Sequence, residues 1–399
     1  MKVKKKLEHF LPYSRQYIDK KDILEVSRTL KNVFITQGPK INEFEKSFAK
    51  YVGSKYAVAC ATGTAALHLS CQSLNLGIGG NLLTSPITFV ASANCAQFVG
   101  ADTHFADIDP ENHCISPSLL EKILKKKKID VIVIVHMSGH SADLDEIYKL
   151  KCKYGFKIIE DSCHALGGKY KNKKIGSCFY SEISTFSFHP VKLITTGEGG
   201  MVTTNDEKIY KKLLKFRTHG IHKNRQEFIN SDLAFDHSGN ANQWYYEMSD
   251  LGYNYRITDI QSALGNSQLK KLDRFIEARR KIAKIYDKGF SSNEFIKTPK
   301  VSPNIKHAYH LYTLMIDFKK LKKTRNELME QLKKFNIGTQ VLYIPVHLQP
   351  YYSKKYNFKL GDFPVAEKYY DNCLSIPIFP DLKKSETNYV IEKINYLVK

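Results

Sequence analysis

The sequence predicts an α/β protein in which a large domain with a mostly parallel sheet precedes a smaller α+β domain. Helix-like and strand-like segments alternate from about residue 22 to residue 206, as in a sheet whose strands are joined by helices. The run VIVIV at 131–135 is continuously apolar, which is typical of a strand covered on both faces. The chain has 399 residues, 42% of them hydrophobic, which is enough to bury two cores.

Each element of the large domain follows from its hydrophobic spacing and from the turn residues beside it. Apolar residues at helical spacing predict helices at 22–32, 42–52, 63–75, 90–100, 116–128 and 143–155. Short apolar or alternating runs predict strands at 56–60, 81–89, 102–109, 129–137, 157–162, 182–188 and 199–206.

The chain leaves this domain through a long helical stretch, predicted at 257–290. The runs HLYTLMIDF and GTQVLYIP, with helical segments at 326–336 and 385–398, then predict the α+β domain. The segment from Ile221 to Ser249 is polar, irregular and long, so we expect a lid or a subunit-interface segment, with disorder as the alternative. We place the domains at 1–30 (an N-terminal segment), 31–256 (large domain) and 257–399 (linking helix and small domain).

The net charge of +21 is high, but the basic residues are spread along the chain, in runs such as KKK at 4–6 and KKKK at 125–128. Such runs are typical of solvated faces, and no aromatic residues are interleaved with them as in nucleic-acid binding proteins. We therefore expect no nucleic-acid partner. A positive field around a cleft favours an anionic small molecule instead.

The eight cysteines include no CxxC pair, and a chain of this size needs no disulfide staples. Reduced thiols and a cytoplasmic location are therefore expected. The basic start MKVKKK is not followed by an apolar stretch, and no run approaches the length of a membrane span, so we expect neither export nor a membrane anchor.

Some motifs are absent or incomplete. GIGGNL at 77–82 and GEGGMV at 197–202 lack the last glycine of a dinucleotide fingerprint, and no GxxxxGK[ST] loop occurs. His136 and His140 have the i, i+4 spacing that would suit zinc on a helix. They follow a strand and flank Ser-Gly, which predicts a loop, so we expect no metal.

A lysine with apolar neighbours stands out in FSFHPVKLITTGEGG at 186–200. Lysine is rarely buried, and on a surface its neighbours are usually polar. Lys192 is therefore either a strand-edge residue or an amine kept in a semi-dry pocket for chemistry.

Three further segments each permit two interpretations. The turn ATGTAAL opens a predicted helix, where free backbone N–H groups can bind an anion, although many turns look alike. Asp161 ends a predicted strand at the sheet edge where α/β folds bind ligands, but it could equally cap a helix or bond to a loop. The aromatic group in LGYNYRITDIQSALG is either a packing patch or part of a site.

Together these segments supply what one cofactor, pyridoxal 5′-phosphate (PLP), needs. Its aldehyde requires a lysine, its phosphate a helix N-terminus with hydroxyl groups, its ring an apolar lid and its pyridine nitrogen a carboxylate. These roles can be filled, in the same order, by Lys192, the turn Gly63-Thr64-Ala65 with Ser187, Phe89 and Asp161.

The chain resembles the sugar-nucleotide aminotransferases of the fold-type I PLP class from about Pro12 to the C-terminus. The resemblance is carried in order by ITQGPKINEFEKSFAKYVG, ATGTAALHLS, SPITFVASANC, EDSCHALGGKYKNKKIGS, FSFHPVKLITTGEGGMVTTND, LGYNYRITDIQSALG and VLYIPVH. SFHPVK-TTGEGG and DSCHALG are most similar to the aminotransferases of the pseudaminic acid pathway. The resemblance implies a large seven-stranded-type sheet domain and a smaller C-terminal domain.

Carried over residue by residue, the resemblance implies that Lys192 forms the Schiff base, Asp161 contacts the pyridine nitrogen, His164 the ring hydroxyl, and Phe89 stacks on the ring. It implies phosphate contacts for Thr64, Ala65, Ser187 and, from the neighbouring subunit, Asn254. It also implies a homodimer with shared active sites. The residues that would touch the sugar nucleotide are Tyr13, Thr36, Gln340 and Tyr343, with His310 and His347 as candidates for either substrate contact or packing.

The implied reaction converts a UDP-4-keto-6-deoxy-N-acetylhexosamine to its 4-amino sugar with L-glutamate as donor. A precursor of bacillosamine, legionaminic acid or perosamine would be an alternative product, and the long segment from His222 to Ser249, a departure from typical relatives, bears on that choice. A sugar dehydratase is disfavoured because that branch replaces the lysine by histidine. A non-catalytic binding protein on the same fold is disfavoured by the presence of Lys192, Asp161 and Ser187.

Overall fold

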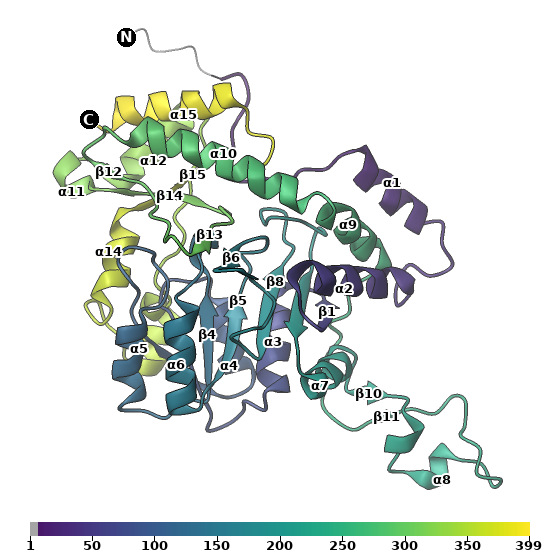
Figure 1. Ribbon diagram of the computed structural model, residues 1–399. Coiled ribbons are helices and arrows are strands. Elements are labelled where there is room, and N and C mark those ends of the chain that lie inside the picture. The colour runs from purple at the N-terminus through teal and green to yellow at the C-terminus, as the bar shows by residue number, and fades with distance from the viewer. Residues whose placement is uncertain (1–6) are drawn as a thin grey trace.

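The computed structural model describes residues 7–399, so the KKK run at 4–6 and the start of the proposed 1–30 segment lie outside the described residues. Its centre is a seven-stranded sheet with the order β1-β9-β8-β5-β4-β2-β3 (Figure 1). The strands are β1 (Tyr56–Cys60), β2 (Asn81–Thr84), β3 (Asp102–Phe105), β4 (Val131–Val135), β5 (Lys157–Asp161), β8 (Ile183–Ser187) and β9 (Gly200–Thr204). All seven predicted strands of the large domain are confirmed.

The sheet is mostly parallel, as predicted. Strands β3, β2, β4, β5 and β8 run parallel to one another, and β9 runs antiparallel to both β8 and β1. The carboxyl ends of β4, β5 and β8 therefore meet at one edge, where α/β folds bind ligands.

Helices cover both faces of the sheet. One face packs against α3 (Gly63–Ser73), α4 (Ala91–Phe98) and α7 (Glu207–Arg217). The other packs against α2 (Pro39–Val52), α5 (Pro117–Leu124) and α6 (Leu144–Tyr154). Along β4, Val131 and Val133 face the first layer and Ile132 and Ile134 the second, which is why this strand is apolar throughout.

A second core lies beside this unit, at the top of Figure 1. It is built on a three-stranded sheet of β12 (Ile296–Lys297), β14 (Tyr312–Ile316) and β15 (Cys373–Ile376). This sheet packs with α10 (Leu272–Phe290), α12 (Arg325–Lys334) and α15 (Lys384–Leu397). Because this core is built mainly from residues after 257, we propose to keep the boundaries 31–256 and 257–399.

Two expectations for the second half need correction. The predicted helix 257–290 is broken after Leu269 into α9 (Asp259–Leu269) and α10, and Lys271 at the break pairs with Asp19 and Asp22 at distances of 2.6 and 2.7 Å. The run GTQVLYIP is not a regular strand, because it pairs only through an isolated bridge between Gln340 and Ser375. It instead passes along the cavity described below.

Several short elements were not predicted, because they span few residues or lack clear periodicity. They are α8 (Ser231–Ala234), α11 (Phe318–Leu321), α13 (Pro350–Tyr356), α14 (Pro364–Asn372), β6 (Lys169–Tyr170), β7 (Lys173–Lys174), β10 (Ile221–His222), β11 (Glu247–Met248) and β13 (Ile305–Lys306). The predicted helix at 22–32 is α1 (Lys20–Thr29), which begins two residues earlier than expected. No helix within residues 7–399 combines the length and apolar character that crossing a membrane requires.

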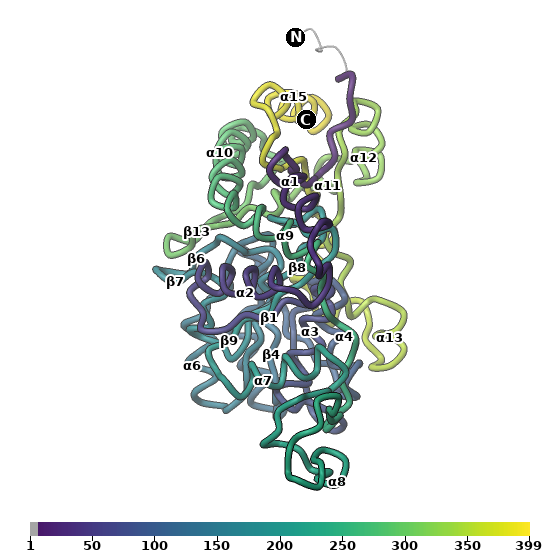
Figure 2. Tube along the Cα trace, turned by 90° about the vertical axis from the view of Figure 1, so that its right-hand side faces the viewer, coloured from purple at the N-terminus to yellow at the C-terminus, as the bar shows by residue number. Residues whose placement is uncertain are grey.

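The segment 221–249 forms an arm that projects from the body beyond α7, as both Figure 1 and Figure 2 show. It is folded rather than irregular: β10 pairs with β11, and the carboxylate of Glu247 accepts the backbone N–H groups of Ile229 and Asn230 at 2.8–2.9 Å. Its role as a lid or a subunit-interface segment stays a prediction.

Candidate active site

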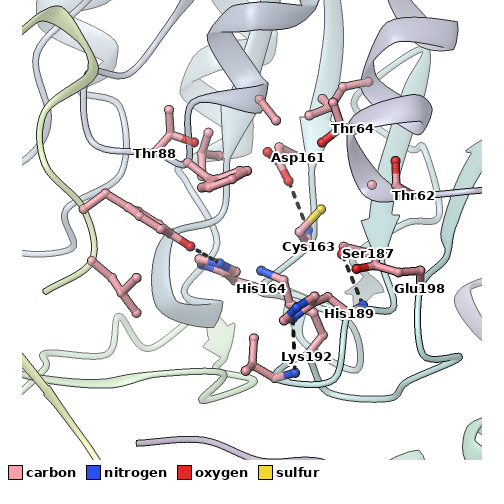
Figure 3. Close-up of a pocket in the computed structure, with 18 of the residues that line it drawn as sticks. Thr62, Thr64, Thr88, Asp161, Cys163, His164, Ser187, His189, Lys192 and Glu198 are labelled. Atoms are coloured by element: carbon pink, nitrogen blue, oxygen red, sulfur yellow. Dashed lines mark hydrogen bonds between the residues drawn. The ribbon is translucent and has the colours of Figure 1, made fainter. Parts of the chain in front are cut away.

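A cavity of about 460 Å³ lies at the carboxyl ends of the central strands (Figure 3). Asp161 ends β5, Ser187 ends β8, and the first turn of α3 closes a third side. Among the predicted site residues, the cavity is lined by Tyr13, Gly63, Thr64, Phe89, Asp161, His164, Ser187, Lys192 and Tyr343. Segments that are far apart in sequence are thus brought together as predicted.

Lys192 lies in a bend past the end of β8, so it is not an edge-strand residue. It is half-buried, and its Nζ atom makes no hydrogen bond or ion pair within residues 7–399. Burial lowers the pKa of the Lys192 amine, and the nearby Cys163 and Asp161 act against this shift. A larger share of the amine is therefore neutral and nucleophilic at a given pH than in an exposed lysine.

Asp161 is 7% exposed and is held at both oxygens. The Ser92 hydroxyl donates to Oδ2 at 2.6 Å, and the backbone N–H of Cys163 donates to Oδ1 at 3.2 Å. The second contact is the loop hydrogen bond that the sequence left open as an alternative. The carboxylate also lines the cavity, so the loop contact does not exclude a contact with a ligand.

His164 belongs to a buried aromatic group. Its Nε2 atom lies 3.1 Å from the Tyr343 hydroxyl, and its ring centroid lies 4.3 Å from that of His310. Burial, reinforced by the charge of Lys192, lowers the pKa of His164 well below its usual value, and burial likewise lowers that of His310. Both rings are therefore neutral at pH 7. The Nδ1 atom of His164 is buried without a partner among the described residues.

The first turn of α3 packs closely against the end of β8. Thr62 caps the helix, and its hydroxyl accepts the backbone N–H of Ala65 at 3.0 Å. A Cβ atom on Gly63 would lie 2.7 Å from the Cβ atom of Ser187, so only glycine fits there. The remaining N–H groups of this turn, the helix dipole and the Ser187 hydroxyl together form an anion site.

Phe89 and Tyr343 lie on the other side of the cavity, with ring centroids 6.0 Å apart. The Phe89 side chain is 55% exposed although its neighbour Thr88 is buried. An exposed phenyl ring at a cavity is suited to cover a flat apolar group.

Four predicted residues do not line this cavity. Ala65 is buried behind it in α3. Thr36 is exposed and bridges to Thr258, and the Gln340 side chain accepts its neighbour's backbone N–H. Asn254 is exposed and bridges to Thr218. Of the two further candidates, His310 packs on His164, and His347 is buried with its Nε2 atom 3.0 Å from Glu367.

Among polar residues at or beside the cavity, sequence reasoning missed Thr62, Thr88, Ser92, Cys163, His189 and Glu198. Thr62 could have been found as the Thr before a helix, the usual N-cap signal. Cys163, His189 and Glu198 adjoin predicted site residues along the chain. No local signal marks Ser92, which reaches Asp161 only through the packing of α4 on β5.

The observed residues fit a cofactor that carries a phosphate, an aldehyde and an aromatic ring. The first turn of α3 and the Ser187 hydroxyl are suited to a phosphate, and the Lys192 amine, which has no partner among the described residues, is suited to an aldehyde. The unpartnered Nδ1 atom of His164 is a buried polar group that needs a partner, which a ring hydroxyl would supply. PLP has all of these groups.

Comparisons with known proteins agree with this geometry. The chain is 40% identical to the spore coat polysaccharide biosynthesis protein SpsC of Bacillus subtilis, over 99% of this chain and 98% of that protein. It is 38% identical to the UDP-4-amino-4,6-dideoxy-N-acetyl-beta-L-altrosamine transaminase of Campylobacter jejuni, over 95% of both chains.

The fold of this chain also matches solved structures of aminotransferases. PseC of Helicobacter pylori, an aminotransferase involved in the biosynthesis of pseudoaminic acid, matches with a TM-score of 0.88 and 30% identity over 98% of this chain and 99% of that one. The "Putative sugar aminotransferase Spr1654 from Streptococcus pneumoniae, PLP-form" matches with a TM-score of 0.87 and 27% identity over 98% and 99% of the two chains.

These matches confirm the predicted fold class, an α/β aminotransferase fold with a large mostly parallel sheet. The model of one protein family covers residues 16–395, nearly the whole chain. The chain is therefore a member of the DegT/DnrJ/EryC1/StrS aminotransferase family.

Proposed function

We propose that this enzyme transfers the amino group of L-glutamate to the C4 keto group of a UDP-4-keto-6-deoxy-N-acetylhexosamine, in the pathway to pseudaminic acid. The observation that carries the proposal is the unpaired, half-buried amine of Lys192, which shares one cavity with the Asp161 carboxylate. The relatives from Campylobacter jejuni and Helicobacter pylori support the choice of sugar.

The cofactor of the enzyme is PLP. When bound, it supplies an aldehyde that carries the amino group and a ring that accepts the electron pair released at the substrate carbon. We assign its aldehyde to Lys192, its pyridine nitrogen to Asp161, its ring hydroxyl to His164 and its ring face to Phe89. The phosphate belongs to the turn at Gly63, Thr64 and Ala65 with Ser187.

Lys192 has two tasks in this proposal. Its Nζ atom holds the cofactor until the donor amine displaces it, and the freed amine then lies beside the donor carbon. There it takes the proton from Cα of glutamate and later delivers a proton to C4 of the sugar. A lowered pKa suits the proton-accepting step, because a larger share of the amine is neutral than in an exposed lysine.

The phosphate assignment predicts the effect of Gly63→Ala. The added Cβ atom would lie 2.7 Å from Ser187, so the turn and the strand end must separate. We expect the dissociation constant for PLP to rise at least about tenfold, because several charge-assisted hydrogen bonds lose their geometry. Titrating the apoprotein with PLP measures this. Gly77→Ala, where an added Cβ atom would meet only the Val99 carbonyl oxygen at 3.8 Å, is the control for a glycine substitution that leaves PLP affinity unchanged.

The exposed Asn254 supports a homodimer with shared active sites. It lies outside the cavity of its own chain, so a contact with the phosphate requires a second copy. We also propose Tyr13, Thr36, Gln340 and Tyr343 as contacts of the sugar nucleotide, and the cytoplasm as the location of the enzyme.

A panel of substrates tests the choice of sugar. The glutamate-treated enzyme is mixed with UDP- and GDP-linked 4-keto sugars of different stereochemistry, and the 4-amino product is detected by mass spectrometry. We expect the UDP-linked N-acetylhexosamine of the pseudaminic acid pathway to react fastest. Preference for a bacillosamine, legionaminic acid or perosamine precursor would contradict the proposed pathway while leaving the aminotransferase intact.

A further inference from the structure

Glu160 is a carboxylate buried directly behind the candidate active site. It precedes Asp161 in β5, and consecutive side chains of a strand point to opposite faces. Ile159, which shares the face of Asp161, packs with α3 and α4, whereas Ile158, which shares the face of Glu160, packs with α5 and α6. Glu160 is 2% exposed and does not line the cavity.

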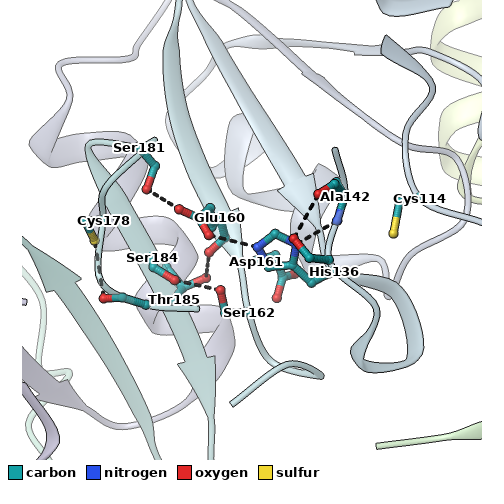
Figure 4. Close-up of polar contacts among 12 residues, drawn as sticks. Cys114, His136, Ala142, Glu160, Asp161, Ser162, Cys178, Ser181, Ser184 and Thr185 are labelled. Carbon is teal, nitrogen blue, oxygen red and sulfur yellow. Dashed lines mark hydrogen bonds and ion pairs between the residues drawn. The ribbon is translucent and has the colours of Figure 1, made fainter. Parts of the chain in front are cut away.

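Both oxygens of Glu160 are hydrogen-bonded, as Figure 4 shows. The Ser181 hydroxyl donates to Oε1 at 2.5 Å, and His136 Nε2 lies 2.9 Å from Oε2. A buried carboxylate is tolerated only when such donors compensate for its lost hydration. The group is therefore held in one orientation.

The ring of His136 is equally fixed. The backbone N–H of Ala142 donates to its Nδ1 atom at 3.2 Å, so the ring proton of this tautomer is on Nε2 and points to Glu160. The residue is fully buried, and both of its ring nitrogens are used.

This group is tied to the backbone of Asp161. His136 follows β4 directly, and its backbone N–H donates to the carbonyl oxygen of Asp161 at 3.2 Å. On the β8 side, the Thr185 hydroxyl donates to the carbonyl oxygen of Glu160 at 3.3 Å. The backbone N–H of Ser162 donates to the carbonyl oxygen of Thr185 at 2.9 Å. The end of β5 is thus held by both neighbouring strands at the point where the Asp161 carboxylate leaves it.

We propose that Glu160 and His136 are positioning residues that fix the backbone of Asp161, so that its carboxylate points into the cavity at a set depth. The inference rests on the proposed function, in which Asp161 contacts the pyridine nitrogen. Displacement of a reacting group by about 1 Å can cost about 100-fold in rate, so such support matters.

The hydrogen bonds of Glu160, rather than its charge, perform this task. In Glu160→Gln, the amide oxygen can accept the His136 Nε2–H, and the NH2 group can donate to Ser181, whose hydroxyl can also accept. The amide therefore keeps the network. In Glu160→Leu, a side chain of similar size keeps the packing volume but leaves the His136 and Ser181 donors without a partner.

The test compares the two variants by PLP affinity and by the position of the visible absorbance band. We expect Glu160→Leu to raise the PLP dissociation constant at least about tenfold, a loss comparable to that of a charge-assisted hydrogen bond, and to shift the band toward that of Asp161→Asn. Glu160→Gln should stay within about threefold of the parent, as for a retained hydrogen-bond network. Tyr312→Phe, which loses a 2.6 Å bond to Asp287 in the second core, controls for lower stability and should not shift the band.

Two results would overturn the inference: a folded Glu160→Leu protein with the affinity and band of the parent, or a Glu160→Gln protein as impaired as Glu160→Leu. If Glu160→Leu does not fold, Ser181→Ala tests the inference instead, because it removes only the Ser181 donor to Glu160. We expect it to change the PLP dissociation constant and the band position in the same directions as Glu160→Leu, but by less. Asp161→Asn distinguishes a failure of the proposed role of Asp161 from a failure of the positioning role alone. If that substitution leaves the band unchanged, the proposed role of Asp161 is wrong; if it shifts the band and Glu160→Leu does not, only the positioning role is wrong.

Discussion

Lys192→Ala is expected to abolish both transamination and the visible absorbance of the PLP-loaded protein. The variant loses the amine that lines the cavity and with it the proposed proton carrier, a role that contributes about 10²–10⁴-fold to such reactions. Because Lys192 has no partner among the described residues, its removal breaks no ion pair, so the fold should persist. The spectrum and the rate of 2-oxoglutarate release measure the effect.

Lys174→Ala is a matched control for this substitution. Lys174 is also half-buried, and its Nζ atom donates to the carbonyl oxygen of Tyr51 at 2.7 Å, away from the cavity. The control should keep activity and absorbance. Full activity of Lys192→Ala would remove this lysine from the mechanism.

Asp161→Asn should leave PLP bound but slow the glutamate half-reaction by about 10²–10³-fold, as expected when one charged group that stabilises the transition state is lost. The asparagine can keep the local contacts, because its oxygen accepts from Cys163 and its NH2 group can donate to the Ser92 hydroxyl. What it loses is the negative charge that, in the proposed role of Asp161, keeps the pyridine nitrogen protonated.

Rapid mixing of the loaded variant with glutamate measures the half-reaction. Since PLP is saturating, reduced affinity does not enter the observed rate. An unchanged rate would show that Asp161 does not help the cofactor ring to accept electrons, even if the variant binds PLP more weakly.

The large domain could be predicted from the sequence because its elements carry local signals. The run at 131–135 is apolar throughout because both faces of β4 are covered, and the turn before α3 is recognisable from Thr62 and Gly63. The short strands of the second core were harder, because a strand such as β12 has only two residues and no periodicity.

The candidate site could be predicted where its residues end predicted strands or open a helix. Asp161 ends a predicted strand, Gly63 opens a helix, and Lys192 was marked by its apolar neighbours; the cavity brings the three together. Its supporting contacts were not predictable. Ser92 reaches Asp161 across 69 residues of sequence, and His136 reaches Glu160 across 24, so both contacts depend on how the layers pack.

The resemblance to sugar-nucleotide aminotransferases implied residue roles that the spacing of residues in the sequence cannot indicate. Nothing in the local sequence indicates the contact with a neighbouring subunit that we propose for Asn254, which lies outside the cavity of its own chain. The length and polarity of 221–249 led us to expect a lid or a subunit-interface segment, but not that the Glu247 carboxylate accepts the backbone N–H groups of residues 229 and 230. That arrangement has no recognisable sequence signal.

A glutamate titration of the PLP-loaded enzyme without sugar nucleotide directly tests whether the enzyme takes its amino group from glutamate. We expect glutamate to bleach the visible band and one 2-oxoglutarate to be released for each Lys192 site. A UDP-4-keto-6-deoxy-N-acetylhexosamine should then restore the band and yield its 4-amino product. A band that persists in saturating glutamate, with no 2-oxoglutarate released, would contradict this expectation.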